Sequence, residues 1–131
     1  MNSTILWIGL VLIVLYFVLS PLWAAGKIAP QEAAEAIASG RAVLVDVREV
    51  SEYAGGVAEP ASLLPLSDLQ GSRVRWKDFL KQNKEKTIIL YCASGMRSAH
   101  AAKVLEKEGY QTRNCGGYGG WKRAGLPVRK P

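Results

Sequence analysis

The stretch TIILYCASGMRSAHAAKVLEKEGY, residues 87–110, places a run of β-branched and apolar residues directly before a helix-like pattern. We expect a strand over 87–91 and a helix from Ser98 to Glu108, with Gly109 as its stop. The same alternation recurs elsewhere. Helical patterns occur at 29–40, 51–56, within 116–128 and, as pieces with a break near Gly71-Ser72, at 68–83, and strand-like runs occur at 42–48, 61–66 and 111–115. Such alternation predicts an α/β fold with an open parallel sheet covered by helices on both faces.

The beginning of the chain is different, because residues 5–25 carry no charged side chain. At about 1.5 Å per residue, a helix over this segment is about 31 Å long and matches the hydrocarbon core of a bilayer. We predict a transmembrane anchor, residues 1–26, followed by one domain, residues 27–131. A cleaved signal peptide fits less well, since residues 1–4 carry no basic side chain and cleavage after Ala25 would put Trp23 at position −3.

The orientation of this segment follows from its flanks. The nearest basic residues, Lys27, Arg41 and Arg48, all lie on its carboxyl-terminal side. Because cytoplasmic flanks of membrane helices are enriched in Lys and Arg, we expect the soluble domain to face the cytoplasm. The expectation is a single-pass membrane protein that contacts the lipid bilayer through residues 5–25.

All charged residues follow residue 26, so the formal net charge of +6 belongs to the expected domain. Such a surplus suits anionic small molecules or an anionic membrane surface. The basic residues are scattered without interleaved aromatic residues, which argues against nucleic-acid binding. One histidine and two cysteines, Cys92 and Cys115, are too few for a structural zinc site or a disulfide framework, and we expect no metal and no organic cofactor.

Cys92 lies where the strand over 87–91 gives way to a helix, and ligands of open α/β sheets bind beyond the carboxyl ends of strands. The short loop Ala93-Ser94-Gly95-Met96 contains a glycine, so its backbone N–H groups can turn inward and form an anion site at the helix N-terminus. Such a site lowers the pKa of a thiol. Arg97 adds a positive charge that can hold an anionic reactant. The alternative is an inert buried cysteine, the more common fate of this residue type.

Three segments resemble one family. CASGMRS, residues 92–98, resembles the active loop of rhodanese-type sulfurtransferases. LVDVREVSEY, residues 44–53, is similar to the family's D-x-R-x-x-x-E-[YF] segment, and GGYGGWKRAGLPV, residues 116–128, is similar to its C-terminal signature. The resemblance covers residues 28–128 and implies a rhodanese-like fold, an open parallel sheet flanked by helices.

The resemblance implies that Cys92 attacks a sulfane sulfur donor, such as thiosulfate or a persulfide, and itself becomes a persulfide. The sulfur would then pass to cyanide or to a thiol acceptor, which a protein can carry. Backbone donors to the persulfide would come from Ala93, Ser94, Gly95, Met96 and Ser98, while Arg97 would bind the anionic donor. The hydroxyls of Ser94 and Ser98 are further candidates for hydrogen bonds to the thiolate or the substrate, and Ser98 also for capping the helix.

The chain departs from the family where the usual pattern is G-H-[IV]-P-G-A, since it has Gly56-Val57-Ala58-Glu59-Pro60-Ala61 and no histidine at Val57. The sulfur chemistry needs no histidine there, but the turn is rewritten. Four residues separate Cys92 from Arg97, whereas rhodanese-related phosphatases and arsenate reductases have five. The tighter loop favours a sulfur atom over a tetrahedral oxyanion, so oxyanion hydrolysis is disfavoured.

Other residues have two interpretations each. In the family Asp46 and Arg48 tie the strand end to nearby loops, and the alternative is a solvent-facing ion pair of little energetic value. Cys115 is a candidate resolving thiol or second sulfur carrier, although packing as a small apolar residue is favoured. His100 is interpreted as a surface residue. Tyr118 and Trp121 are candidates for the pocket rim, with structural packing as the default.

The sequence thus predicts a membrane-anchored sulfurtransferase of the thiosulfate sulfurtransferase type, with a Cys92 persulfide as intermediate. The alternative hypothesis is a membrane-tethered persulfide-relay or protein-interaction module with little turnover of small molecules.

Overall fold

The computed structural model describes the backbone of residues 2–24 and 26–131, and the side-chain surroundings of residues 2–15 and 26–131. Helix α1, Ser3–Ala24, precedes the domain, and most of its described side chains are exposed. Among the described residues, no helix has both the length and the apolar character that crossing a membrane requires. The predicted bilayer segment, residues 5–25, runs into residues 16–25, whose side chains lie outside the described part of the chain. Membrane anchoring therefore stays a prediction.

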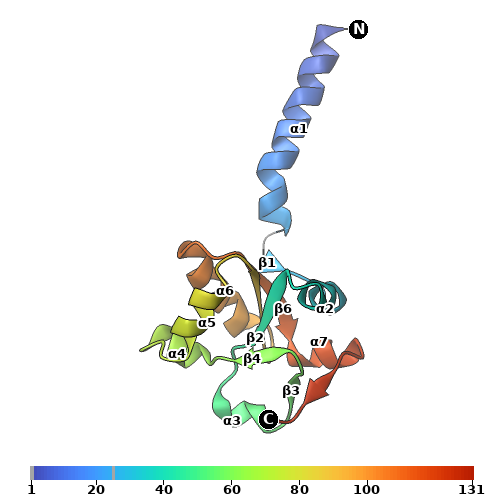
Figure 1. Ribbon diagram of the computed structural model, residues 1–131. Coiled ribbons are helices and arrows are strands. Elements are labelled where there is room, and N and C mark those ends of the chain that lie inside the picture. The colour runs from blue at the N-terminus through green and yellow to red at the C-terminus, as the bar shows by residue number, and fades with distance from the viewer. Residues whose placement is uncertain (1, 25) are drawn as a thin grey trace.

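Five parallel strands form the main sheet, in the order β1-β6-β5-β2-β4 (Figure 1). Along the chain they are β1 (Gly26–Lys27), β2 (Ala42–Asp46), β4 (Ala61–Leu63), β5 (Thr87–Cys92) and β6 (Thr112–Gly117). A separate antiparallel pair is made by β3 (Val57–Ala58) and β7 (Val128–Arg129). Parallel neighbours need crossover connections, and the intervening helices supply them.

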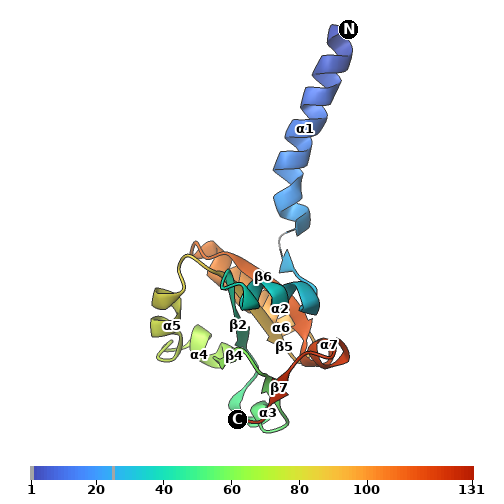
Figure 2. The ribbon, with the colours of Figure 1, turned by 45° about the vertical axis from the view of Figure 1, so that its right-hand side comes forward.

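Helices cover both faces of the main sheet (Figures 1 and 2). Residues of α4 (Leu66–Gln70), α5 (Trp76–Gln82) and α6 (Met96–Lys107) contribute to one buried cluster, and residues of α2 (Pro30–Ala38) and α7 (Tyr118–Arg123) to the other. The short helix α3 (Val50–Tyr53) follows β2 at the carboxyl end of the strands. The predicted α/β architecture, with an open parallel sheet between helices, is confirmed.

The central strand β5 shows why the sequence contains continuous apolar runs. Its side chains alternate between the two clusters, with Ile88, Leu90 and Cys92 on the α4–α6 side and Ile89 and Tyr91 on the α2–α7 side. Because both faces are buried from Ile88 to Cys92, the strand is a continuous apolar run over this stretch, as is typical of parallel sheets. Each of the buried aliphatic side chains contributes about 1.5–3 kcal/mol to folding. The alternation also fixes which helices lie over Cys92.

The rewritten turn at residues 56–61 has its own packing. Val57 and Ala58 are fully buried in β3, and the Ala58 N–H donates to the Tyr91 hydroxyl at 2.9 Å. Gly56 has φ of 114°, and a Cβ there would lie 2.6 Å from the Tyr118 hydroxyl oxygen, so the position requires glycine. An apolar strand thus stands where the family pattern has its histidine.

Several details differ from the sequence-based expectations. The strand expected over 61–66 ends at Leu63, and Leu66 already belongs to α4. Helix α6 begins at Met96, two positions before the expected Ser98, because Gly95 forms the bend that starts it. Strand β6 continues beyond residue 115 to Gly117. The strands β1, β3 and β7 are not predicted from the sequence, since each has only 2 residues and so shows no periodicity.

Candidate active site

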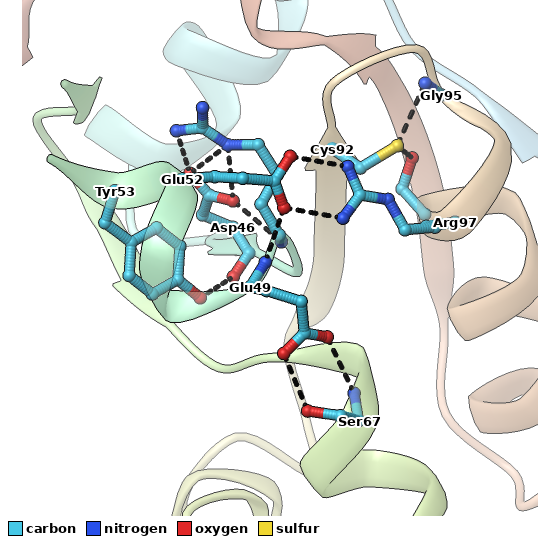
Figure 3. Close-up of polar contacts among 10 residues, drawn as sticks. Asp46, Glu49, Glu52, Tyr53, Ser67, Cys92, Gly95 and Arg97 are labelled. Atoms are coloured by element: carbon cyan, nitrogen blue, oxygen red, sulfur yellow. Dashed lines mark hydrogen bonds and ion pairs between the residues drawn. The ribbon is translucent and has the colours of Figure 1, made fainter. Parts of the chain in front are cut away.

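Cys92 is the last residue of β5 and lies beneath the loop that leads into α6 (Figure 3). Its sulfur accepts a hydrogen bond from the Gly95 N–H, with 3.0 Å between nitrogen and Sγ. The Ser98 hydroxyl oxygen lies 3.4 Å from the same sulfur. The sulfur therefore has polar neighbours, although the exposed fraction of Cys92 is 0%.

Two close backbone approaches hold the loop in this shape. Gly95 has φ of 92°, in the left-handed region, and a Cβ there would lie 3.2 Å from the Gly116 Cα. A Cβ on Gly117 would lie only 2.3 Å from the Ala93 carbonyl oxygen. Glycine is the residue that permits both the bend and the contact with the end of β6. As a result, the Gly95 N–H points at the sulfur.

The surroundings of Cys92 favour its ionised form. Burial raises the pKa of the Cys92 thiol, but hydrogen bonds from the Ser98 hydroxyl and from the backbone N–H groups of Ser98, Ser94 and Gly95 outweigh it. The net effect places the pKa of Cys92 below that of an ordinary cysteine. Since the thiolate is the nucleophile, this arrangement increases the reactive fraction at neutral pH. The site lies at the start of a 12-residue helix, whose dipole also favours an anion.

Asn114 of β6 holds this loop through its side-chain hydrogen bonds. The sequence does not predict this role. Its Oδ1 accepts hydrogen bonds from the Ser98 hydroxyl at 2.8 Å and from the Gly116 N–H at 3.0 Å. Its Nδ2 donates to the Gly95 carbonyl oxygen at 2.9 Å. One side chain thus ties the loop and the first turn of α6 to the neighbouring strand. A single asparagine in a weakly patterned strand gives no signal in the sequence.

Arg97 forms a bidentate ion pair with Glu52 of α3 (Figure 3). Its Nη1 and Nη2 donate to the two carboxylate oxygens at 2.7 and 2.8 Å. Hydrogen bonds from Arg97 are the main reason that the pKa of Glu52 falls to about 2, against the opposing effect of burial. The sequence predicts that Arg97 binds an incoming anion, whereas in the structure both of its terminal nitrogens donate to the Glu52 carboxylate. Glu52 is not among the predicted site residues, although it lies in the LVDVREVSEY segment.

Asp46 and Arg48 form a buried pair next to this site. Arg48 Nη2 donates to Asp46 Oδ2 at 2.7 Å and to the Gly56 carbonyl oxygen at 2.8 Å. The Arg48 side chain is 8% exposed and the Asp46 side chain 0%, so the alternative of a solvent-facing ion pair is wrong. The pair ties the end of β2 to the turn before β3. The hydroxyl of Tyr53 also donates to the Asp46 carbonyl oxygen, at 3.1 Å.

The loop residues above the sulfur differ in exposure. Ala93, Ser94 and Met96 are exposed, and Met96 reaches 78%. Arg97 is partly buried and Ser98 is fully buried. Exposed side chains thus surround a sulfur whose own residue has no exposed surface.

The remaining candidates have structural places. Cys115 is buried on the α2–α7 side of the sheet, away from Cys92, and burial raises its pKa to about 11. This agrees with packing and not with a resolving thiol. His100 is exposed, and its Nε2 lies 3.0 Å from the Gln70 side-chain nitrogen, as expected of a surface residue. Tyr118 and Trp121 are buried in the same cluster as Cys115.

Comparison with protein families gives a match over most of the domain. Residues 29–124 match the family described as the Rhodanese-like domain. The match includes the Cys92 loop, the Glu52 segment and most of the glycine-rich C-terminal region.

Individual proteins are also similar to this chain. An uncharacterized protein of Synechocystis is 38% identical over 105 residues, which cover 79% of this chain and 55% of that protein. The chain thus spans little more than half the length of that relative. Thiosulfate sulfurtransferase GlpE of Actinobacillus pleuropneumoniae is 30% identical over 105 residues, with 78% and 91% covered. The solved structure of a human single-domain sulfurtransferase superposes with a TM-score of 0.64 at 28% identity, covering 76% of this chain and 96% of that one.

Proposed function

We propose a reaction for this chain, which belongs to the Rhodanese-like domain family: it is a sulfurtransferase that carries sulfane sulfur on Cys92. In the first half-reaction, the Cys92 thiolate attacks the sulfane sulfur of thiosulfate or of a persulfide. The sulfur–sulfur bond of the donor breaks, and sulfite or a thiolate leaves with the electron pair. In the second half-reaction, an acceptor thiolate attacks the outer sulfur of the Cys92 persulfide and restores the Cys92 thiolate.

The observation that carries this proposal is the hydrogen bond from the Gly95 N–H to the Cys92 sulfur at 3.0 Å. The same inward-facing loop can hold the persulfide anion that the first step forms, since its amides and the helix dipole already compensate a negative sulfur. The names of similar proteins, thiosulfate sulfurtransferase and single-domain sulfurtransferase, support the same reaction class.

Arg97 has a more limited part in the proposal than the sequence suggests. A guanidinium has five N–H donors, and Glu52 takes one from each terminal nitrogen. The remaining donors can hydrogen-bond to a substrate anion at the rim. Ala93, Ser94, Gly95, Met96 and Ser98 supply the backbone of the cradle.

Turnover of thiosulfate by purified protein, with cyanide or a small thiol as acceptor, tests the reaction. Cys92→Ser is expected to abolish turnover, because an alcohol is not ionised at neutral pH and forms no persulfide. Cys115→Ser is the matched control, since Cys115 lies on the other side of the sheet. Full activity of the Cys92→Ser protein would refute the proposal.

A persulfide relay is the second candidate, favoured by the 0% exposure of Cys92. A protein partner that displaces the exposed loop could receive the sulfur directly, while small donors and acceptors turn over poorly. Mass spectrometry of Cys92 as isolated, together with affinity capture from membranes, separates the two functions. A persulfide on Cys92 with little turnover of small donors would favour the relay.

The proposal includes a membrane location, with residues 5–25 in the bilayer and the domain in the cytoplasm. Its support is the uncharged sequence of this segment and the position of Lys27 two residues after its end. Extraction of membranes with alkaline carbonate tests the anchoring, because a spanning protein stays in the pellet. Reporter fusions at the C-terminus test the side of the membrane.

A further inference from the structure

The charged groups beside Cys92 compensate one another before any donor arrives. The Arg97 guanidinium lies near the Cys92 sulfur, which is one of the groups that raise the pKa of Arg97. Both terminal nitrogens of Arg97 are nevertheless directed at Glu52 (Figure 3). The carboxylate of Glu49 is a second negative group near Arg97. The Arg97 guanidinium and the carboxylates of Glu49 and Glu52 together carry a formal charge of −1, although the whole chain carries +6.

The neighbouring cation does not change this balance. Arg48 lies in the buried pair with Asp46, where the two formal charges cancel. Glu49 accepts hydrogen bonds from the Ser67 hydroxyl at 2.7 Å and from the Ser67 N–H at 3.2 Å, so its charge is held in place without a cationic partner among these contacts. Within this network of described side chains, Arg97 is the one group that can attract a donor anion. Both of its terminal nitrogens already donate to Glu52.

We infer that Glu52 is a specificity-determining residue that selects sulfur donors of low negative charge, such as persulfides and thiosulfonates, over the thiosulfate dianion. This inference rests on the proposed sulfur-transfer function and deepens it. Thiosulfate brings two negative charges to a guanidinium that is already compensated, and it must compete with Glu52 for Arg97. A persulfide needs no such cation, because its leaving group is a thiolate that departs with a single charge.

Glu52 also has a structural contact that a test must separate from its charge. Its Oε2 accepts a hydrogen bond from the Glu49 N–H at 2.8 Å, as part of the capping box of α3. Glu52→Gln keeps one oxygen for these hydrogen bonds and removes the charge. Glu52→Asp keeps the charge and shortens the side chain. A purely structural role would change both variants in the same way.

Two sulfur donors of nearly the same shape but different charge separate the effect of donor charge from that of donor size. Methanethiosulfonate replaces one anionic oxygen of thiosulfate with a methyl group and so carries one negative charge less. In both, the thiolate attacks the sulfane sulfur and a sulfur oxyanion leaves with the electron pair. A unit charge about 7 Å from the donor, at an effective dielectric constant of about 40–80, alters the preference between the two by about threefold to sevenfold. This effect should diminish as ionic strength rises.

The experiment measures kcat/KM for thiosulfate and for methanethiosulfonate in the full chain. Wild type is expected to prefer methanethiosulfonate, and Glu52→Gln should raise the ratio of thiosulfate to methanethiosulfonate by about threefold to sevenfold. Glu52→Asp should keep the wild-type ratio. The charge control is Glu85→Gln, an exposed position before β5 at the end opposite to Cys92, which should also keep the ratio.

The possible results are distinct. If Glu52→Gln and Glu52→Asp lose activity toward both donors in parallel, with an unchanged ratio, Glu52 is structural and the inference is overturned. Should Glu52→Gln not fold, the wild-type preference decides, and a preference for thiosulfate overturns the inference. If wild type transfers sulfur from neither donor, the proposed function fails and this inference with it. If the variants are active and their ratio of kcat/KM for the two donors equals that of wild type, the inference about Glu52 fails and the proposed function stands.

Discussion

Replacing Ser98 with alanine tests how the site sets the pKa of Cys92. The Ser98 residue is fully buried, and its hydroxyl oxygen lies 3.4 Å from the Cys92 sulfur and 2.8 Å from Asn114 Oδ1. A hydroxyl has one proton, so it donates to Asn114 or to the sulfur, but not fully to both. When Cys92 ionises, the hydrogen bond from the Ser98 hydroxyl to the sulfur becomes stronger, and the one to Asn114 Oδ1 becomes weaker.

The size of the pKa change that Ser98→Ala causes at Cys92 follows from the exchange of these two hydrogen bonds. A hydrogen bond to a charged group contributes about 1.5–3 kcal/mol, and a neutral one about 0.5–1.5 kcal/mol. The thiolate thus gains about 1 kcal/mol from Ser98, which equals about 0.7 pKa units. Asn114 Oδ1 keeps the Gly116 N–H as a donor in the variant, at 3.0 Å, so no buried acceptor is left unpaired.

The assay is the rate of alkylation of Cys92 by iodoacetamide as a function of pH, in a Cys115→Ser background. The pKa of Cys92 lies below its ordinary value, so thiolate reactivity persists below the ordinary pKa of a cysteine and is lost as the pH falls through the lowered pKa. Ser98→Ala should move this loss upward by about 0.7 pH units. Ser94→Ala is the control, because Ser94 acts through its backbone N–H, which alanine keeps. An unchanged or lower midpoint in Ser98→Ala would refute the reasoning.

Three further substitutions test other parts of the account. Asp46→Asn leaves the buried Arg48 guanidinium uncompensated and should lower the free energy of unfolding by about 3–5 kcal/mol in urea denaturation, and a change below about 1 kcal/mol would contradict it. Gly117→Ala puts a Cβ 2.3 Å from the Ala93 carbonyl oxygen, so kcat/KM should fall more than about tenfold with the circular dichroism spectrum retained, whereas wild-type activity would show that the loop needs no such contact. Arg97→Ala should raise the KM for thiosulfate with little change in kcat, and an unchanged KM removes Arg97 from donor binding.

The sequence predicts the parts of this site that are contiguous in the chain. The strand end at Cys92, the glycine bend and the start of the following helix lie within seven residues, and their chemistry follows from local rules for loops and helix N-termini. The fold class follows from the same local alternation of strands and helices. Continuous apolar runs such as TIILY also predict burial on both faces, which the two clusters confirm.

The parts that the sequence does not reveal depend on long-range contacts. Glu52 and Arg97 are 45 positions apart, and their pairing requires α3 to lie beside the loop at the carboxyl end of the sheet. Asn114 meets Ser98 across 16 positions, through the register of β6 beside β5. Neither register nor the placement of a four-residue helix can be read from periodicity. The pairing of Arg97 with Glu52 therefore emerges only from the folded chain.

The most direct test of the central claim is mass spectrometry of the intact protein after incubation with a sulfane sulfur donor and removal of the excess. The account predicts a mass increase of one sulfur atom, located on the peptide that contains Cys92 and released by a thiol acceptor. Cys115→Ser should show the same increase and Cys92→Ser none. Sulfur found on Cys115 with Cys92 unmodified, or no sulfur on either cysteine with any donor, would contradict it.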